Sequence, residues 1–377
     1  MPEIDVRAGH AGLERLPAAL AEALQRIEVQ QSDGDPVRPP DGFQLTFTGD
    51  AVSRDGADLA LLASSALATG ARVSVSVAVH GMSAVLFVGV VTHRQVLWDE
   101  DTAQPELVVT GRDLGVLLDL QERFRPIPAN GVEGVVGFVL AAHAADLTAD
   151  IAVPASDWLQ RGEGYGTFQQ GTDLEYLRSL AATCGGTFAV LPGTGPGRGR
   201  GRFGPADLTG EPALDLVVGG PAPTVRSIAF GHDAAAARTA QYQSFDADTT
   251  ATTGLREIRT SADWTGLATS SALAATNSLR GTALLPTRDL LPGSRAASAA
   301  QGIVDRDVRR AVVAHCTMDL LVHPAVVRAP CLARVIGAGH TFDGRYYLGA
   351  VTHVIDTESH VAALTLQRGA VGGGGRV

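Results

Sequence analysis

The sequence predicts a β-rich α+β protein in which two antiparallel β-barrel modules are separated by mixed helical and strand segments. Two observations favour this fold class. Apolar and polar residues alternate with a period of two over residues 40–112 and again over residues 313–368, as in half-buried strands. Helical spacing is confined to shorter segments, which lie before and between these stretches and, at residues 57–69, within the first one. A chain of 377 residues is long enough for two or three domains with a substantial core.

The first module is expected to begin with an amphipathic helix at residues 12–27. Five aliphatic residues recur there at helical spacing: Leu13, Leu16, Leu20, Leu24 and Ile27. The period then changes to two, and a polar, proline-rich turn at residues 32–40 separates the first two strands. A short helix is expected over residues 57–69, ending at Gly70. Further strands are expected at residues 73–79, 85–94 and 106–110.

Residues 113–213 mix helical and strand patterns and predict an α/β middle domain. Thr172-Asp-Leu-Glu175 has the sequence of a capping box, in which the Thr172 hydroxyl accepts the Glu175 N–H and the Glu175 carboxylate accepts the Thr172 N–H. The helix that follows has one apolar face. It is expected to end at Gly185-Gly186 and to lead into a strand at residues 187–191.

Strand patterns return after residue 213, but an alanine-rich stretch with helical spacing at residues 296–313 interrupts them. The second barrel is therefore expected to be discontinuous in the sequence. The resulting division gives a helix and first barrel at residues 1–112, the middle domain at 113–213, the second barrel at 214–260 and 313–368, a helical insertion at 261–312 and a glycine-rich tail at 369–377.

A β-hairpin closes the second module. Residues 348–355 alternate between the two faces of a strand, and the alternation resumes after the polar turn Thr357-Glu-Ser359. An Asp343-Gly344 turn precedes the first of these strands. The last two strands of the chain are therefore expected to pair with each other.

These features, taken in their order along the chain, resemble the baseplate hub proteins of contractile injection systems. The family includes phage tail hubs of the late control D type, the hub portion of type VI secretion spike proteins and extracellular contractile injection system hubs. The resemblance is carried by Gly42-Phe-Gln-Leu-Thr-Phe47, Thr172-Asp-Leu-Glu-Tyr-Leu177, Phe342-Asp-Gly-Arg-Tyr-Tyr347, Val351-Thr-His-Val-Ile355 and Leu364-Thr-Leu-Gln-Arg368.

The resemblance implies two tube-like β-barrels with α/β insertions in each subunit, and a homotrimer that forms a pseudo-sixfold ring. Such a ring joins the sixfold inner tube to the threefold spike. The implied partners are further copies of the chain, a spike protein, an inner tube or tube-initiator protein, other baseplate proteins and effector cargo. Assembly is expected in the cytoplasm, as part of a phage-tail-like particle. Neither a spike domain nor a peptidoglycan-binding segment is recognisable in the sequence, so the spike is expected on a separate polypeptide.

Composition narrows the function classes. The formal net charge is −10, which disfavours binding to nucleic acid phosphates or to anionic membranes. All thirty basic residues are arginine, so a phosphate-binding loop with lysine and a lysine Schiff base are excluded. The longest apolar run, residues 135–142, is too short to span a membrane, and no secretory leader is recognisable at the N-terminus. The chain is expected to stay in the cytoplasm.

We expect no catalytic, cofactor-binding or metal-binding residues. His340, His353 and His360 lie close in the sequence, but their positions in strands and turns favour ordinary framework histidines over metal ligands. The Gly-Arg repeat at residues 193–204 is interpreted as a mobile surface loop rather than a nucleic-acid site. Residues 246–250 resemble a calcium loop weakly and are interpreted as a polar loop. The three cysteines, Cys184, Cys316 and Cys331, are expected to be buried apolar residues rather than zinc ligands or disulfide partners.

Two alternatives to a structural hub remain open. One is a hydrolytic enzyme with convergent carboxylates, because acidic side chains from distant positions can meet in a fold. The other is a carbohydrate-binding surface protein, against which the absence of a recognisable leader counts. A closed pocket that holds acids with shifted pKa values would favour the enzyme.

Overall fold

The computed structural model describes residues 3–372 except 11, 39, 50–63, 80, 99–104, 128–130, 153–166, 234, 237, 247–250, 253, 259–263, 265–266, 268–280 and 286–292. Among the described residues every helix is too short or too polar to cross a lipid bilayer. Strands predominate over helices, which confirms the expected β-rich α+β class.

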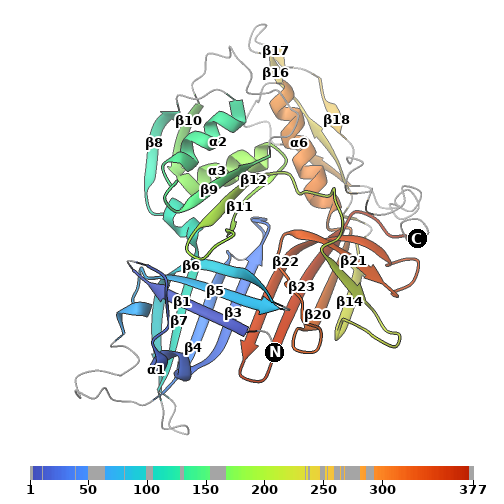
Figure 1. Ribbon diagram of the computed structural model, residues 1–377. Coiled ribbons are helices and arrows are strands. Elements are labelled where there is room, and N and C mark those ends of the chain that lie inside the picture. Colours follow the sequence, from blue (N-terminus) through green and yellow to red (C-terminus); the bar gives the residue numbers. More distant parts are fainter. Residues whose placement is uncertain are drawn as a thin grey trace.

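Thirteen of the described strands belong to one large sheet (Figure 1). They are β1 (Glu3–Gly9), β2 (Glu14–Arg15), β3 (Leu24–Ser32), β4 (Gly42–Thr48), β5 (Arg72–Val79), β6 (Met82–Leu97), β7 (Glu106–Asp113), β13 (Leu214–Val217), β14 (Ser227–His232), β20 (Val312–Asp319), β21 (Cys331–Ile336), β22 (Gly344–Asp356) and β23 (His360–Arg368). Their pairing follows an open path, β14-β20-β23-β22-β3-β4-β7-β6-β5-β1-β2, with β21 beside β22 and β13 beside β21. The two expected barrels are thus continuous with each other, and the described strands close neither of them.

The sheet consists of two lobes with the same strand order. The first lobe runs β3-β4-β7-β6-β5-β1, and the second runs β14-β20-β23-β22-β21-β13. Corresponding strands pair in the same antiparallel sense, except that β1 is antiparallel to β5 whereas β13 is parallel to β21. The β6–β7 hairpin and the β22–β23 hairpin each contain a register shift, which lies between Val91 and His93 in β6 and between Leu348 and Ala350 in β22. The chain therefore contains one strand arrangement twice.

Each lobe encloses its own apolar core. In the first lobe, alternate residues of the strands are fully buried, among them Leu45, Phe47 and Val75. In the second lobe the core is filled by residues such as Cys316, Tyr346 and Leu364. The period-two patterns of the sequence are the direct cause, because one face of each strand packs inward and the other meets solvent or a neighbouring domain.

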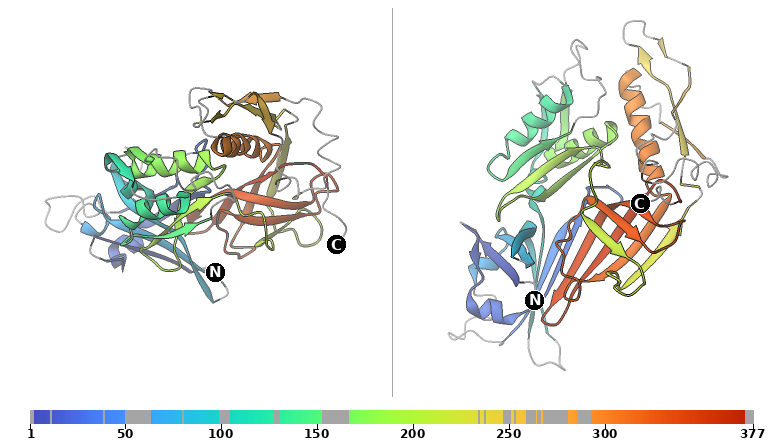
Figure 2. Two further views of the ribbon diagram at one scale, coloured as in Figure 1. Left: turned by 90° about the horizontal axis from the view of Figure 1, so that it is seen from above. Right: turned by 45° about the vertical axis from the view of Figure 1, so that its right-hand side comes forward.

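The α/β middle domain lies above the lobes (Figures 1 and 2). It contains β8 (Glu122–Ile127), α2 (Gly131–Ala141), β9 (Leu147–Ile151), β10 (Thr167–Thr172), α3 (Asp173–Thr183), β11 (Thr187–Pro192) and β12 (Gly199–Gly204). The expected capping box forms, with Thr172 Oγ1 accepting from the Glu175 N–H and Glu175 Oε2 accepting from the Thr172 N–H. Gly185 ends α3 at φ 75°, a left-handed conformation that favours glycine.

The Gly-Arg repeat was expected to be a loop, and this expectation is wrong for residues 199–204, which form β12. Gly199, Gly201 and Phe203 point into the middle-domain core, whereas Arg200 and Arg202 point outward and pair with Asp150. Glycine suits the inward positions because a Cβ at residue 199 would lie 2.9 Å from Leu147 Cδ2. Glycine and arginine therefore divide between the two faces of a strand.

A helical element with its own small sheet lies beside the middle domain. It consists of β15 (Arg238–Tyr242), β18 (Arg256–Ile258), β19 (Gly281–Leu284) and α6 (Gly293–Val308), with the short pair β16 (Phe245–Asp246) and β17 (Ala251–Thr252). Ala296, Ala300 and Val304 of α6 pack on Ala240 and Tyr242 of β15. The strands at residues 238–258, expected in the second barrel, thus pair with one another and with β19 rather than with the large sheet. The exact domain boundaries stay predictions.

The expected helix at residues 12–27 is mostly wrong. Only α1 (Ala18–Ala23) is helical, and residues 24–32 form β3. Ile27 and Val29 are buried while Glu28 is only half-buried, so this stretch also has period two, and pairing on both edges of β3 stabilises the strand. The expected helix at residues 57–69 lies largely outside the described residues. Its described part contains a 3-10 turn at Ser65–Leu67.

Candidate functional site

The two lobes meet at the lobe junction, which we define as residues 26–32 of β3 paired with residues 350–356 of β22. The pairing is antiparallel, with Ile27 opposite Ile355 and Val29 opposite His353. All four side chains are buried. The junction is therefore a continuous piece of sheet rather than a linker, and it fixes the two lobes relative to each other.

A buried histidine pair supports the second-lobe side of the junction. His353 Nδ1 lies 3.1 Å from His360 Nε2, and His353 Nε2 lies 3.0 Å from the carbonyl oxygen of Val327. Burial, with the neighbouring His360 as a smaller cause, lowers the pKa of His353 to about 3. Burial lowers the pKa of His360 to about 4. Both rings are neutral at pH 7, and they hold the loop before β21 against the hairpin.

The exposed His340 takes no part in this pair. No group of three or more His, Cys, Asp or Glu side chains within the described ranges is arranged to hold a metal ion. Residues 247–250 of the weak calcium-like segment lie outside the described residues. Cys184 and Cys316 are buried, Cys331 is half-buried, and none of the three forms a disulfide.

An ion network fastens the turn that follows α6 to the loop after β3, next to the lobe junction. Arg309 Nη1 lies 3.1 Å from Asp33 Oδ2, the second Arg309 nitrogen contacts Asp35, and Arg310 Nη2 lies 2.8 Å from Asp35 Oδ2. Burial alone would raise the pKa of Asp35, but the two guanidinium groups hold it below its usual value. The Asp33 N–H also donates to the carbonyl oxygen of Gly349 in β22. Three distant segments of the chain are therefore tied together here.

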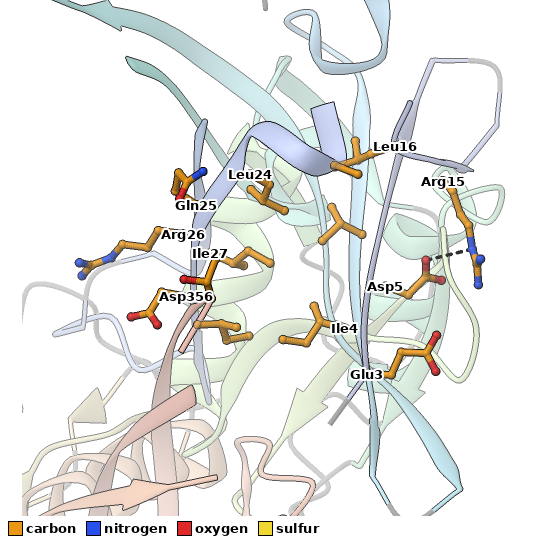
Figure 3. Close-up of a pocket in the computed structure, with 14 residues that line it drawn as sticks. Glu3, Ile4, Asp5, Arg15, Leu16, Leu24, Gln25, Arg26, Ile27 and Asp356 are labelled. Carbon is orange, nitrogen blue, oxygen red and sulfur yellow. Dashed lines mark ion pairs between the residues drawn. The ribbon is translucent and has the colours of Figure 1, made fainter. Parts of the chain in front are cut away.

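A groove with a volume of about 330 Å³ lies at one end of the lobe junction (Figure 3). Apolar side chains from β1, β3 and β22 line its floor, including Ile4, Leu24, Ile27 and Ile355. Charged side chains surround it, and Arg15 and Asp5 form an ion pair of 3.4 Å on its rim. The lining contains carboxylates and guanidinium groups but no cysteine, histidine or serine among the described residues. An apolar floor with a charged rim suits contact with another protein better than chemistry on a small substrate.

Two buried carboxyl groups have raised pKa values. Burial and the nearby Asp113 raise the pKa of Asp41 to about 7, and burial raises the pKa of Asp113 to about 6 despite the opposing charge of Arg178. Asp41 accepts a 2.9 Å hydrogen bond from the Ser32 N–H, and Asp113 accepts one of 3.0 Å from the Gly115 N–H. Both groups therefore hold backbone turns where the first lobe meets the middle domain.

Neither of these carboxyl groups lines the groove at the lobe junction. They are also absent from the walls of a second groove of similar volume, between the end of β11 and residues 326–331. Sequence reasoning missed both acids, because nothing in the spacing of Asp41 and Asp113 distinguishes them from the many surface carboxylates. The sequence likewise does not distinguish Asp33 and Asp35, the aspartates that bind Arg309, from surface carboxylates.

No protein-family model matches the sequence, and no curated protein matches it. Solved structures are similar over almost the whole chain. The 43 kDa tail protein of prophage MuSo2 from Shewanella oneidensis matches with a TM-score of 0.65 at 14% identity, covering 98% of both chains. The tail protein from Neisseria meningitidis MC58 matches with a TM-score of 0.62 at 14% identity, covering 97% of this chain and 96% of that one.

A third structure is an Escherichia coli component of the type VI secretion system, described as similar to T4 bacteriophage tail proteins. It matches with a TM-score of 0.52 at 10% identity, covering 92% of this chain and 73% of that one. At these identities the likeness concerns the fold. The chain thus has the fold of phage tail proteins and of a type VI secretion component, as the sequence resemblance predicted.

Proposed function

We propose that the chain is a structural baseplate hub of a contractile, phage-tail-like injection system, which assembles as a homotrimer between the sixfold inner tube and the threefold spike. The repeated strand order of the two lobes carries this proposal. Three copies of a chain with two similar lobes present six similar lobes around one threefold axis. Such a ring can match sixfold symmetry on one face and threefold symmetry on the other. The likeness to tail proteins over the full chain supports the same role.

The proposed partners are further copies of the chain, a separate spike protein, the inner tube or tube-initiator protein, and other baseplate proteins. Three copies would triple the formal charge of −10, and an acidic ring repels anionic cargo from its wall. The tube-like closure of each lobe belongs to the assembled ring in this proposal, since the described strands of one chain leave the sheet open.

A non-enzymatic role agrees with the placement of the perturbed acids. A hydrolase with convergent carboxylates needs a carboxyl group with a raised pKa at a substrate-sized cavity. Asp41 and Asp113 instead bind backbone N–H groups beneath the middle domain and line neither groove. The groove at the lobe junction has the apolar floor of a protein contact. We therefore favour assembly over catalysis.

The proposal is tested by measuring the mass of the purified full chain, alone and mixed with tube and spike proteins of a contractile injection system, and by imaging the products in negative stain. We expect particles of three times the 39.0 kDa of one chain and ring-shaped projections. A chain that remains monomeric in every mixture, without rings, would refute the hub function.

A further inference from the structure

The repeat of the two lobes leaves one edge of β6 without the partner that its counterpart has. In the second lobe, one edge of β22 pairs with β21 through residues 344–348 and then with β3 through residues 350–356. β6 corresponds to β22, and it pairs with β5 only up to Val90. Beyond the bulge, residues 93–97 pair with β7 on one edge, and no other described strand pairs with the second edge.

The same comparison identifies a second open edge on β14. β3 pairs with β4 on one edge and with β22 on the other. Its counterpart β14 pairs with β20, and no second partner is found among the described strands. β14 lies at the outer end of the second lobe, away from the first lobe (Figure 1). Each open edge is thus the counterpart of an edge that is occupied in the lobe junction.

We propose that β6 of one copy pairs with β14 of the next copy, which repeats the lobe junction between subunits. This inference rests on the proposed homotrimeric hub and names the surface through which its subunits join. Open strand edges have unpaired N–H and C=O groups and favour the addition of another strand. A different strand on each side gives a head-to-tail contact, which closes into a ring when the rotation fits.

The two bulges fix the register of the proposed pairing. Thr92 is the extra residue of the bulge in the β6–β7 pairing, and Gly349 is the extra residue in the β22–β23 pairing. Counting from these two residues, Val96 corresponds to His353 and Trp98 corresponds to Ile355. The ladders of β4 and β20 align Ile27 with Ile228 and Val29 with Phe230. Transferring the β22–β3 register gives antiparallel pairs of His93 with Asp233, Gln95 with Gly231, Val96 with Phe230, Leu97 with Ala229 and Trp98 with Ile228.

The exposure of these residues agrees with a missing neighbour. Ile27 and Ile355 are only 4% and 3% exposed at the occupied junction. Their counterparts are more exposed, since Trp98 is 62% exposed and Ile228 is only half-buried. On the other face of the sheet, Leu97 is 42% exposed, and Ala229, which would lie opposite it in the neighbouring copy, is exposed as well. Large apolar residues on an open strand edge are a liability for a lone subunit and suit a subunit contact.

In this register His93 comes opposite the exposed carboxylate of Asp233 and Arg94 comes opposite His232, so charge does not select the register and the alternation of the strands must do so. A slip by one residue would place Trp98 and Val96 on the opposite face from Ile228 and Phe230, so the apolar pairs would be lost. The alternation of both edges therefore excludes one-residue slips, and the register transferred from the lobe junction selects the pairing.

A pair of cysteines tests the register directly. In the full-length variant carrying both Leu97→Cys and Ala229→Cys, oxidation should form disulfides between neighbouring copies, and gels without reductant should show covalent dimers and trimers with no larger species. The matched control carries Leu97→Cys and Ile228→Cys, whose side chains point to opposite faces of the sheet, and should stay uncrosslinked. The three natural cysteines interfere little, because Cys184 is buried and burial raises the pKa of Cys316 to about 12 and that of Cys331 to about 11.

A side-chain truncation gives an independent measurement. Mass photometry on a dilution series measures the protein concentration at which half of the trimers have dissociated. We expect Trp98→Ala to raise this concentration at least tenfold, while Phe124→Ala on β8 leaves it unchanged. Phe124 is the matched control because it is an aromatic residue of similar exposure, 78%, in the middle domain. If trimers form but the first cysteine pair does not crosslink and Trp98→Ala has no effect, the β6–β14 pairing is wrong and the hub function stands. If the wild-type chain remains monomeric in all mixtures, both fail.

Discussion

Asp41 links the stability of the first lobe to pH, and Asp41→Asn is expected to remove much of this dependence. In the folded chain the pKa of Asp41 is raised from 3.8 to about 7, mainly by burial and secondly by the nearby Asp113. A carboxyl whose folded pKa exceeds its unfolded value binds its proton more tightly in the native state. Its contribution to stability is therefore full below the unfolded pKa of 3.8 and is lost as the pH rises through about 7.

The magnitude follows from the shift. About three pKa units, at ~1.4 kcal/mol each, set an upper bound of about 4 kcal/mol on the loss between about pH 4 and pH 8. The asparagine side chain would keep an oxygen for the Ser32 N–H, which now donates to Asp41 Oδ2. Its amide nitrogen would take the place of Oδ1, which has no hydrogen-bond partner among the described atoms. A constant cost of about 1–3 kcal/mol at every pH is therefore expected as well.

The measurement is the free energy of unfolding in urea, followed by circular dichroism at several pH values between about 4 and 8. We expect the wild type to lose on the order of 2–4 kcal/mol more than the variant across this range. Glu122→Gln, which removes an exposed carboxylate, serves as the control and should follow the wild type. Parallel curves for wild type and Asp41→Asn would refute the reasoning, because they would mean that Asp41 is ionised in the folded chain throughout.

Three further changes test the contacts that position the domains. Arg309→Ala leaves two buried aspartates without their shared cation and should lower the free energy of unfolding by about 3–5 kcal/mol, measured in urea. Thr172→Ala removes the N-cap of α3 and should cost about 1 kcal/mol in the same assay, whereas Thr172→Ser should recover most of it. Gly34→Ala should lower the thermal midpoint clearly more than Gly210→Ala: both positions have positive φ, but only a Cβ at residue 34 meets a backbone oxygen, at 2.2 Å. Equal effects of the two glycine changes would contradict this account.

Local patterns in the sequence predicted most elements of the large sheet. The strands at residues 73–79 and 85–94 and the closing hairpin follow from period-two alternation, and the start and end of α3 follow from its capping box and Gly185. β1 was missed, although Ile4, Val6 and Ala8 alternate with polar residues and could have indicated it. These successes share one cause: each depends on neighbours within a few residues along the chain.

The errors arose where a distant part of the chain decides the conformation. Residues 24–27 fit a helix as well as a strand, and pairing with β22, near the other end of the chain, selects the strand. The Gly-Arg repeat has the composition of a loop, but the apolar side chains beneath it leave room only for glycine. The buried Arg309 network joins residues 276 positions apart, for which no sequence pattern exists.

The sequence by itself determined the β-rich class, the order of most strands and helices, and the resemblance that predicted a tail-protein fold, because periodicity, caps and turn residues act locally. Only the tertiary structure decided that the two barrels form one continuous sheet, that the same strand order occurs twice, and that β6 and β14 have open edges among the described strands. Strand pairing is a contact between residues far apart in the chain, and its register depends on bulges and neighbouring strands that alternation alone does not specify.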